Sequence, residues 1–239
     1  MVVINSGATQ TSSSPAVADT RINIHRDRLA CAIPSRYEPR LYFGAANVVA
    51  LTAIVVSLWP LHAVSSLELL TVPLAFLAAN WVEYLVHRGP MHHLRRGREI
   101  LFERHTSQHH VYFDHEHMAA RTPREYYWVF FPWWAIGLVI VTAALLALPL
   151  WWFVSENVAR LFFAVGITYY LTYEWLHFSY HVPHNSPIGR LRLVRALRGL
   201  HTAHHDPARM TECNFNITFP ICDLLYRTKS TPPSRHSDH

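Results

Sequence analysis

Histidine is the residue type in this chain whose number and spacing most clearly indicate chemistry. The 239 residues include 18 histidines, and twelve of these lie in two clusters. One cluster runs from Glu83 to His110, and the other runs from Glu174 to His205. Imidazole is the commonest protein ligand for metal ions, and it binds Fe, Zn, Cu and Ni. The two clusters therefore indicate a metal site.

The second cluster has helical spacing. Residues three or four apart share one face of a helix. His177 and His181 are four residues apart, and His201 precedes His204 by three residues and His205 by four. This spacing predicts that the imidazoles converge from two helices.

The first cluster combines a helical pair with a predicted turn. His105 and His109 are four residues apart, and His110 follows directly. His87 ends an apolar run, and the four residues between it and His92 include a Gly-Pro dipeptide. Glycine and proline are expected to break the helix there and turn the chain back, so that both imidazoles face one centre.

The number of matched positions indicates more than one ion. Ten imidazoles exceed the four ligands of tetrahedral zinc and the six of an octahedral ion, which predicts two ions with positions left for oxygen. We expect a supporting or surface role for His93, His115, His117 and His184. The ten candidate ligands are His87, His92, His105, His109, His110, His177, His181, His201, His204 and His205.

Two other metal constellations fit less well. Glu174 and His177 form a Glu-x-x-His pair, but a carboxylate di-iron bundle needs a second such pair, and Glu83 lies four residues from His87. We expect both glutamates to accept hydrogen bonds from ligand N–H groups instead. A haem between two histidines would require them at mid-membrane depth, whereas these lie at the ends of apolar runs.

Four apolar runs must position the clusters. They cover about 41–61, 67–86, 127–153 and 158–180, and each reaches the ~20 residues that cross a bilayer. The mean hydropathy is only +0.08 because polar loops separate the runs. Soluble core helices are the alternative, but two of the runs contain no acidic or basic residue. The sequence predicts an all-α membrane protein with four transmembrane helices and a cytoplasmic helical cap that holds a histidine-rich dimetal site.

The basic residues predict the orientation. Of 21 Lys and Arg, only Arg160 lies near the short connections at 62–66 and 155–157. The other basic residues share the side of both histidine clusters, which the positive-inside rule makes cytoplasmic. The net charge of +5 is thus explained without nucleic acid. A bacterial inner membrane and an endoplasmic reticulum both fit.

Composition also predicts the domain organisation. Residues 1–35 are rich in Ser, Thr, Ala and Gly, which predicts a flexible tail. The membrane domain is expected over 36–230 and a second flexible tail over 231–239. Three cysteines without C-x-x-C spacing predict no disulfide framework.

The segment from about 80 to 228 resembles the fatty acid hydroxylase/sterol desaturase superfamily of integral membrane di-iron enzymes. EYLVHRGPMH at 83–92 resembles its H-x4-H box, HFSYH at 177–181 its H-x3-H box, and HTAHH at 201–205 its H-x2-HH box. HTSQHH at 105–110 is one residue longer than the usual second box. NFNITFPICDLLYRT at 214–228 resembles the segment after the last box, and the first box is most similar to that of fatty acid 2-hydroxylases.

The resemblance implies an oxidoreductase in which two iron ions and O₂ attack a C–H bond of a fatty acyl or sterol-like lipid from the bilayer. It implies hydroxylation, with desaturation as the alternative. A cytochrome b5-like domain is not recognisable, so a separate cytochrome b5-like protein or ferredoxin with its reductase is expected to donate electrons. Candidates for lining the lipid route are Trp128, Phe131, Trp133, Trp134, Tyr169, Tyr170 and Tyr173.

Two non-enzymatic classes remain open. A membrane metal transporter would usually place ionisable ligands near the bilayer midplane, whereas both clusters lie at one interface. A lipid-binding scaffold with a structural metal would need fewer than ten ligands.

Overall fold

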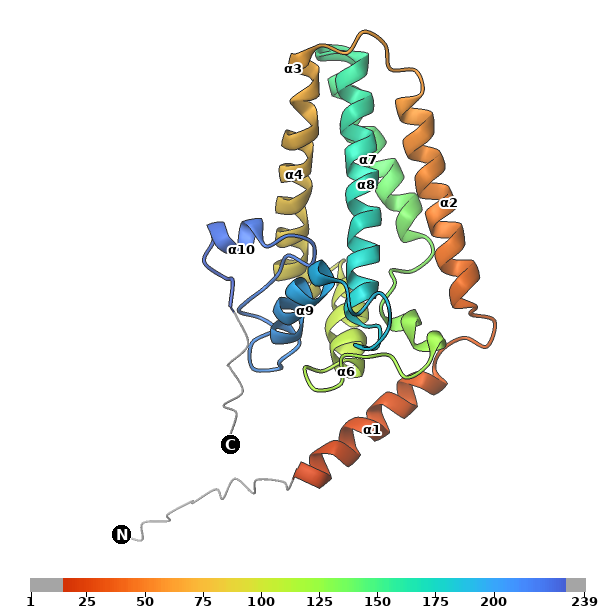
Figure 1. Cartoon of the computed structure of the whole chain (residues 1–239), viewed down its shortest axis with the longest axis vertical. Helices are drawn as coiled ribbons and strands as arrows, with labels where there is room; N and C mark the ends of the chain where they lie inside the picture. Colours follow the sequence, from red (N-terminus) through yellow and green to blue (C-terminus); the bar gives the residue numbers. More distant parts are fainter. Residues whose placement is uncertain (1–14, 231–239) are drawn as a thin grey trace.

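The computed structural model describes residues 15–230, which are helical and contain no strand within that range (Figure 1). Four long helices run side by side: α2 (Pro39–Leu58), α4 (Thr71–Val86), α7 (Ala135–Phe153) and α8 (Glu156–Tyr180). Most of the remaining elements gather at one end of this bundle and form a cap. The remaining elements are α1 (Pro15–Cys31), α3 (Ser66–Leu69), η1 (His87–Met91), α5 (Glu99–Phe102), η2 (Glu103–His109), α6 (His110–Tyr112), η3 (Pro123–Trp128), α9 (Arg192–His204) and α10 (Ile221–Leu225).

Three helices of the described chain are long and apolar enough to cross a membrane: Pro39–Leu58, Ser66–Met91 and Ala135–Phe153. Their large apolar side chains point outward, and Val56 and Leu74 are each more than 60% exposed. A soluble protein rarely exposes so much contiguous apolar surface, whereas a lipid-facing helix is expected to. The predicted membrane class is therefore supported for three of the four runs.

Helix α8 occupies the centre of the bundle and packs against α2, α4 and α7 (Figure 1). It covers the fourth predicted run, but it is not among the three helices that qualify as membrane spans by length and composition. Ile167 and Ala164 on this helix are buried, and Glu174 is buried as well. Since neighbouring helices cover α8, it can carry polar residues that a lipid-facing helix could not.

The third run is shorter as a helix than the sequence predicts. Helix α7 begins at Ala135 rather than near residue 127, because η3 ends at Trp128 and Pro132 interrupts the segment between them. Val129 and Phe130 are buried in the cap. The start of the predicted run therefore belongs to the cap.

The N-terminal segment also differs from the expected tail. Residues 15–31 form α1, while 1–14 and 231–239 lie outside the described residues. Arg26 and Ile33 are buried, and Ile33 packs against Tyr112 and Trp128. A polar composition predicts little burial, but these few side chains suffice to attach the segment to the cap.

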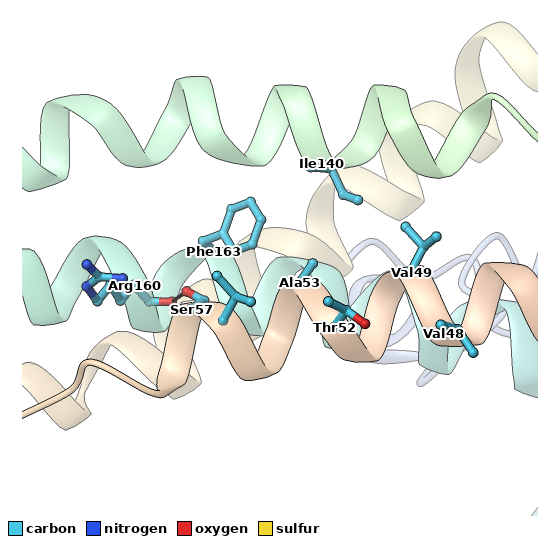
Figure 2. A pocket seen from close by; sticks show the side chains of 9 residues that line it. Val48, Val49, Thr52, Ala53, Ser57, Ile140, Arg160 and Phe163 are labelled. Carbon is cyan, nitrogen blue, oxygen red and sulfur yellow. Dashed lines mark hydrogen bonds between the residues drawn. The ribbon is translucent and has the colours of Figure 1, made fainter.

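At the opposite end of the bundle, polar contacts hold the short connections together. Glu68 accepts hydrogen bonds from the Ser155 hydroxyl at 2.6 Å and from the Asn157 amide at 3.3 Å, which joins α3 to the start of α8. Nearby, a groove of about 560 Å³ lies between α2, α7 and α8, with Phe163 and Arg160 in its lining (Figure 2). Arg160 forms an ion pair with Glu156 at 2.6 Å, so its charge is partly balanced there.

Candidate metal centre

All ten candidate histidines are buried where the cap meets the bundle, and none is more than 6% exposed. Helices α4 and α8 both end at this point, so His87 and His177 lie at the same end of the bundle. The other candidates come from η2, α6 and α9 or from the residues that directly follow η1, α8 and α9. Residues from four segments of the chain, 87–92, 105–110, 177–181 and 201–205, are thus brought into one cluster.

The cluster divides into two groups. Within each group, the potential ligand atoms all lie within 4.8 Å of one another. His205 lies between the groups: its Nε2 is 3.2 Å from that of His109 and 3.0 Å from that of His201, and its ring stacks on His110 with centroids 4.1 Å apart. The first group is His87, His92, His105, His110 and His204, and the second is His109, His177, His181 and His201.

The Nε2 atoms point toward one another across each group. The distance between Nε2 atoms is 2.9 Å for His92 and His204, and 3.1 Å for His181 and His201. Two neutral imidazoles repel when their Nε2 lone pairs point at each other over such a short distance, and a cation bound by both nitrogens removes the repulsion. The donor set therefore fits two metal ions held by imidazole nitrogen.

A wide helical turn explains the longer second box. In η2, the N–H of His110 donates to the carbonyl of His105, five residues back. This winding places the Nε2 of His105 3.1 Å from that of His110 and turns His109 toward the other group. The rings of His105 and His109 still stack, with centroids 5.3 Å apart, but the two residues belong to different groups because the turn is π-helical rather than α-helical. The extra residue of the box is absorbed in this turn.

A second π-helical turn replaces the predicted chain reversal after α4. Element η1 continues the helix through Pro90, and the rings of His87 and His92 lie 5.0 Å apart. Proline has no N–H to donate to the carbonyl four residues earlier, so the α-helical ladder cannot continue there. The wider turn puts residues five apart on one side, which brings both imidazoles into the first group.

In five of the ten imidazoles, Nδ1 lies within hydrogen-bonding distance of a backbone carbonyl oxygen. The Nδ1–H then donates to the carbonyl and leaves the Nε2 lone pair facing the centre. Such bonds fix both the tautomer and the ring orientation. The pairs are His87 with Phe215, His109 with Trp128 (2.9 Å), His181 with Met118 (2.8 Å), His204 with Cys213 (2.8 Å) and His205 with Phe113.

Glu83 acts on the backbone rather than on a histidine. Its carboxylate accepts hydrogen bonds from the backbone N–H groups of Ile217 and Thr218. The expectation that it accepts from a ligand N–H is wrong, because the carbonyls of the segment 213–218 already take that role. Glu83 holds this segment in place, and the segment orients His87 and His204.

Glu174 has a similar indirect role. It accepts from the backbone N–H of Phe131 at 3.2 Å and from the hydroxyl of Tyr170 at 3.3 Å, so the expected bond to a ligand N–H is wrong here too. Phe131 stacks on Tyr173 with centroids 5.3 Å apart, and Tyr173 lies 5.6 Å from the ring of His177. The carboxylate thus holds an aromatic stack beside the second group.

Sequence reasoning missed the role of Asp223. This residue is fully buried in α10 and accepts hydrogen bonds from the backbone N–H groups of Phe215 and Asn216 at 2.9 and 2.8 Å. An aspartate inside the apolar run ICDLL is the signal that could have revealed it, because a buried carboxylate must be paired. Asp223 thus holds the two residues that directly precede the two bound by Glu83.

Burial keeps the candidate ligands neutral. It lowers the pKa of their imidazoles well below the usual 6.5, and neighbouring imidazoles lower it further. Neutral imidazole is the form that binds metal, so the site is ready for ions at pH 7. The residues outside the spanning helices to which this applies are His105, His109, His110, His181, His201, His204 and His205.

The four histidines for which the sequence predicts a supporting or surface role lie outside both groups. His93, His115 and His184 are exposed, and His117 is half-buried with its Nδ1 3.1 Å from Asp114. His184 contacts the guanidinium of Arg198 at 2.8 Å. These positions agree with the surface role expected from the sequence.

Comparison with known proteins gives one match. The model of a family described as fatty acid hydroxylase matches residues 72–228, which include every candidate histidine and the segment that orients His87 and His204. No curated protein and no solved structure matches the chain.

Proposed function

The chain belongs to the fatty acid hydroxylase family, and we propose that it is an integral membrane enzyme that hydroxylates a fatty acyl lipid with two iron ions and O₂. The observation that carries the proposal is the set of ten buried imidazoles, nine of them in two groups and His205 between the groups. Two ions a few ångströms apart are a common arrangement in metalloenzymes. The finding that three helices can span a membrane fits a lipid substrate.

The reaction balances as R–H + O₂ + 2 e⁻ + 2 H⁺ → R–OH + H₂O. Two iron ions, when bound, supply the redox chemistry that activates O₂. The electrons come from a partner, for which we propose a separate cytochrome b5-like protein or a ferredoxin with its reductase. The chain itself contributes neutral imidazoles in fixed orientations and a buried site from which water is excluded.

The acyl chain is proposed to reach the site from the bilayer. Both groups lie at the end of the bundle where the span Ser66–Met91 ends. The stack of Phe131 and Tyr173 beside His177 offers an apolar surface for a methylene chain. In the proposed topology α8 is a fourth span, and the cap faces the cytoplasm of a bacterium or the cytoplasmic side of the endoplasmic reticulum.

Desaturation is the second candidate reaction. It starts from the same hydrogen abstraction, but a second hydrogen leaves in place of oxygen transfer to carbon, and a difference of about an ångström in geometry decides between them. The similarity of residues 83–92 to a 2-hydroxylase box favours hydroxylation near the carboxyl end of the chain. A metal transporter is disfavoured because the ligands lie at one end of the bundle.

The test uses purified protein in lipid vesicles with a reductase system, ¹⁸O₂ and an acyl lipid. We expect a product heavier by one ¹⁸O atom, and we expect its loss in His92→Ala but not in His93→Ala. These neighbours form a matched pair, because His92 is buried in the first group and His93 is exposed. A double bond formed without label would show that the enzyme is a desaturase.

A further inference from the structure

Helix α1 precedes the segment that matches the family, yet it inserts a charged side chain into the cap. Arg26 is only 3% exposed. Arginine is almost never buried to this extent unless it is paired. The partners of Arg26 therefore indicate what it does.

Arg26 contacts three groups of the cap. Its Nη2 donates a hydrogen bond to the carbonyl of Ala119 at 3.1 Å. The same nitrogen lies 4.0 Å from the carboxylate of Glu125, which is 3% exposed, and the guanidinium lies over the ring of Tyr112, 5.1 Å from its centroid. Through its hydrogen bond to Ala119, Arg26 thus holds the turn 118–121 against α1.

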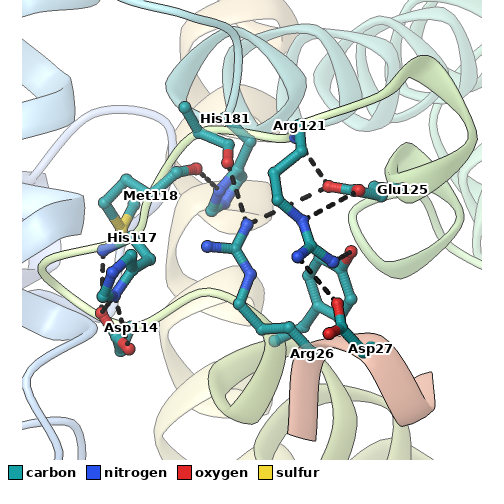
Figure 3. A network of polar contacts seen from close by, with 10 residues as sticks. Arg26, Asp27, Asp114, His117, Met118, Arg121, Glu125 and His181 are labelled. Atoms are coloured by element: carbon teal, nitrogen blue, oxygen red, sulfur yellow. Dashed lines mark hydrogen bonds and ion pairs between the residues drawn. The ribbon is translucent and has the colours of Figure 1, made fainter. Parts of the chain in front are cut away.

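The same turn holds a candidate ligand (Figure 3). The carbonyl of Met118 accepts from the Nδ1 of His181 at 2.8 Å, and the N–H of Ala120 donates to the carbonyl of His181 at 2.9 Å. Ala119, the residue that Arg26 binds, lies between these two contacts. A shift of the turn would move the carbonyl that sets the orientation of the His181 ring.

We propose that Arg26 is a positioning residue for the metal centre, which acts by holding the turn 118–121 against His181. The inference rests on the proposed function, in which His181 is a metal ligand. It extends the site to a helix outside the family segment, so that α1 becomes part of the machinery that orients the second group.

An outer contact joins α1 to the same turn, but it is too exposed to do this alone. Arg121 forms an ion pair with Asp27 at 2.9 Å, and the side chain of Asp27 is 67% exposed. Exposed pairs contribute little to stability. Loss of Arg26 would leave Glu125 with Arg121, whose Nε lies 3.2 Å from the carboxylate, but it would remove the buried hydrogen bond to the carbonyl of Ala119.

The experiment compares metal binding by the full-length wild-type protein and the Arg26→Gln variant, both purified in detergent. Titration with Co²⁺ gives the number of ions, their affinity and a ligand-field spectrum, none of which depends on activity. We expect Arg26→Gln to bind one of the two ions about 10-fold more weakly and with an altered spectrum, as for other residues that orient ligands. Arg28→Gln removes the same charge from an exposed position on α1 and should match the wild type.

A double-mutant cycle identifies the route. If Arg26 acts through His181, Arg26→Gln should cause no further change in a His181→Ala background. A wild-type affinity and spectrum in Arg26→Gln, or an undiminished effect in the His181→Ala background, would overturn the inference. Arg26→Lys, read by the same criteria, replaces Arg26→Gln if that variant does not fold. Failure of the wild type to bind Co²⁺ would instead refute the proposed metal centre.

Discussion

The carboxylate of Glu83 accepts a hydrogen bond from the backbone N–H of Thr218 at 3.0 Å, although the two residues are 135 positions apart in the chain. This contact fixes the C-terminal segment against α4. Because carbonyls of the same segment hold His87 and His204, the contact links α4 to the orientation of the first histidine group.

Replacement of Glu83 should therefore weaken both stability and metal binding. Glu83→Gln places an amide N–H₂ opposite hydrogen-bond donors, and we expect a loss of about 1–3 kcal/mol in the free energy of unfolding. Metal affinity should fall about 10- to 100-fold, as for other residues that orient ligands. Thermal unfolding in detergent and metal titration measure the two effects. Glu116→Gln, at an exposed position, is the control, and an unchanged affinity in Glu83→Gln would contradict the proposed role.

The two groups predict separate losses of metal. His204→Ala removes a member of the first group and His201→Ala a member of the second, so each variant should retain about one ion. His205→Ala should impair both ions, because its Nε2 lies against the second group while its ring stacks on His110. Elemental analysis of purified protein measures the ratio. His115→Ala should keep both ions, and two ions in His201→Ala would disprove the grouping.

Acid should destabilise the metal-free protein. The pKa values of buried histidines such as His181, His201 and His205 are lowered well below 6.5. Below pH 6.5 the unfolded chain therefore binds protons that the folded chain does not, and stability falls as the pH falls. Thermal unfolding at about pH 8 and about pH 5.5 should show a lower midpoint in acid.

Fewer buried histidines should weaken this dependence on pH. A variant with His201 and His205 replaced by leucine should show a smaller difference between the two midpoints than the wild type. An equal difference would mean that other groups cause the acid sensitivity.

The one-sided basic residues predict the topology. A reporter fused after His239 should lie in the cytoplasm, because only Arg160 of the 21 Lys and Arg lies near the short connections. A cysteine introduced at Ser65 in a chain without its natural cysteines should be labelled by an impermeant reagent from outside. Labelling only after the membrane is opened would reverse the assignment.

Sequence patterns predicted the elements whose signal is local. The runs at 41–61 and 158–180 correspond to α2 and α8 within a few residues, because a long, mostly apolar run without an internal proline favours a continuous helix. The ten histidines were found by type and spacing, and the structure places all of them in one buried cluster.

The rest depended on contacts between distant segments. The π-helical turns η1 and η2 bring histidines from distant segments together at one site. The spacing of His105 and His109 in the sequence, which also fits an α-helix, does not reveal these turns. The roles of Glu83 and Asp223 depend on backbone N–H groups far along the chain or across a turn, and backbone groups carry no sequence signal. Arg26 resembles any surface arginine until α1 is placed on the cap.

The central position of α8 has a consequence for how the protein is made. A ribosome synthesises α2, α4 and α7 before α8, and these are the helices that enclose it. Glu156, Arg160 and Glu174 make α8 a poor substrate for release into lipid by itself. In the proposed topology α8 therefore enters the membrane between helices already present, and the cap that completes the histidine cluster can close only after this last insertion step.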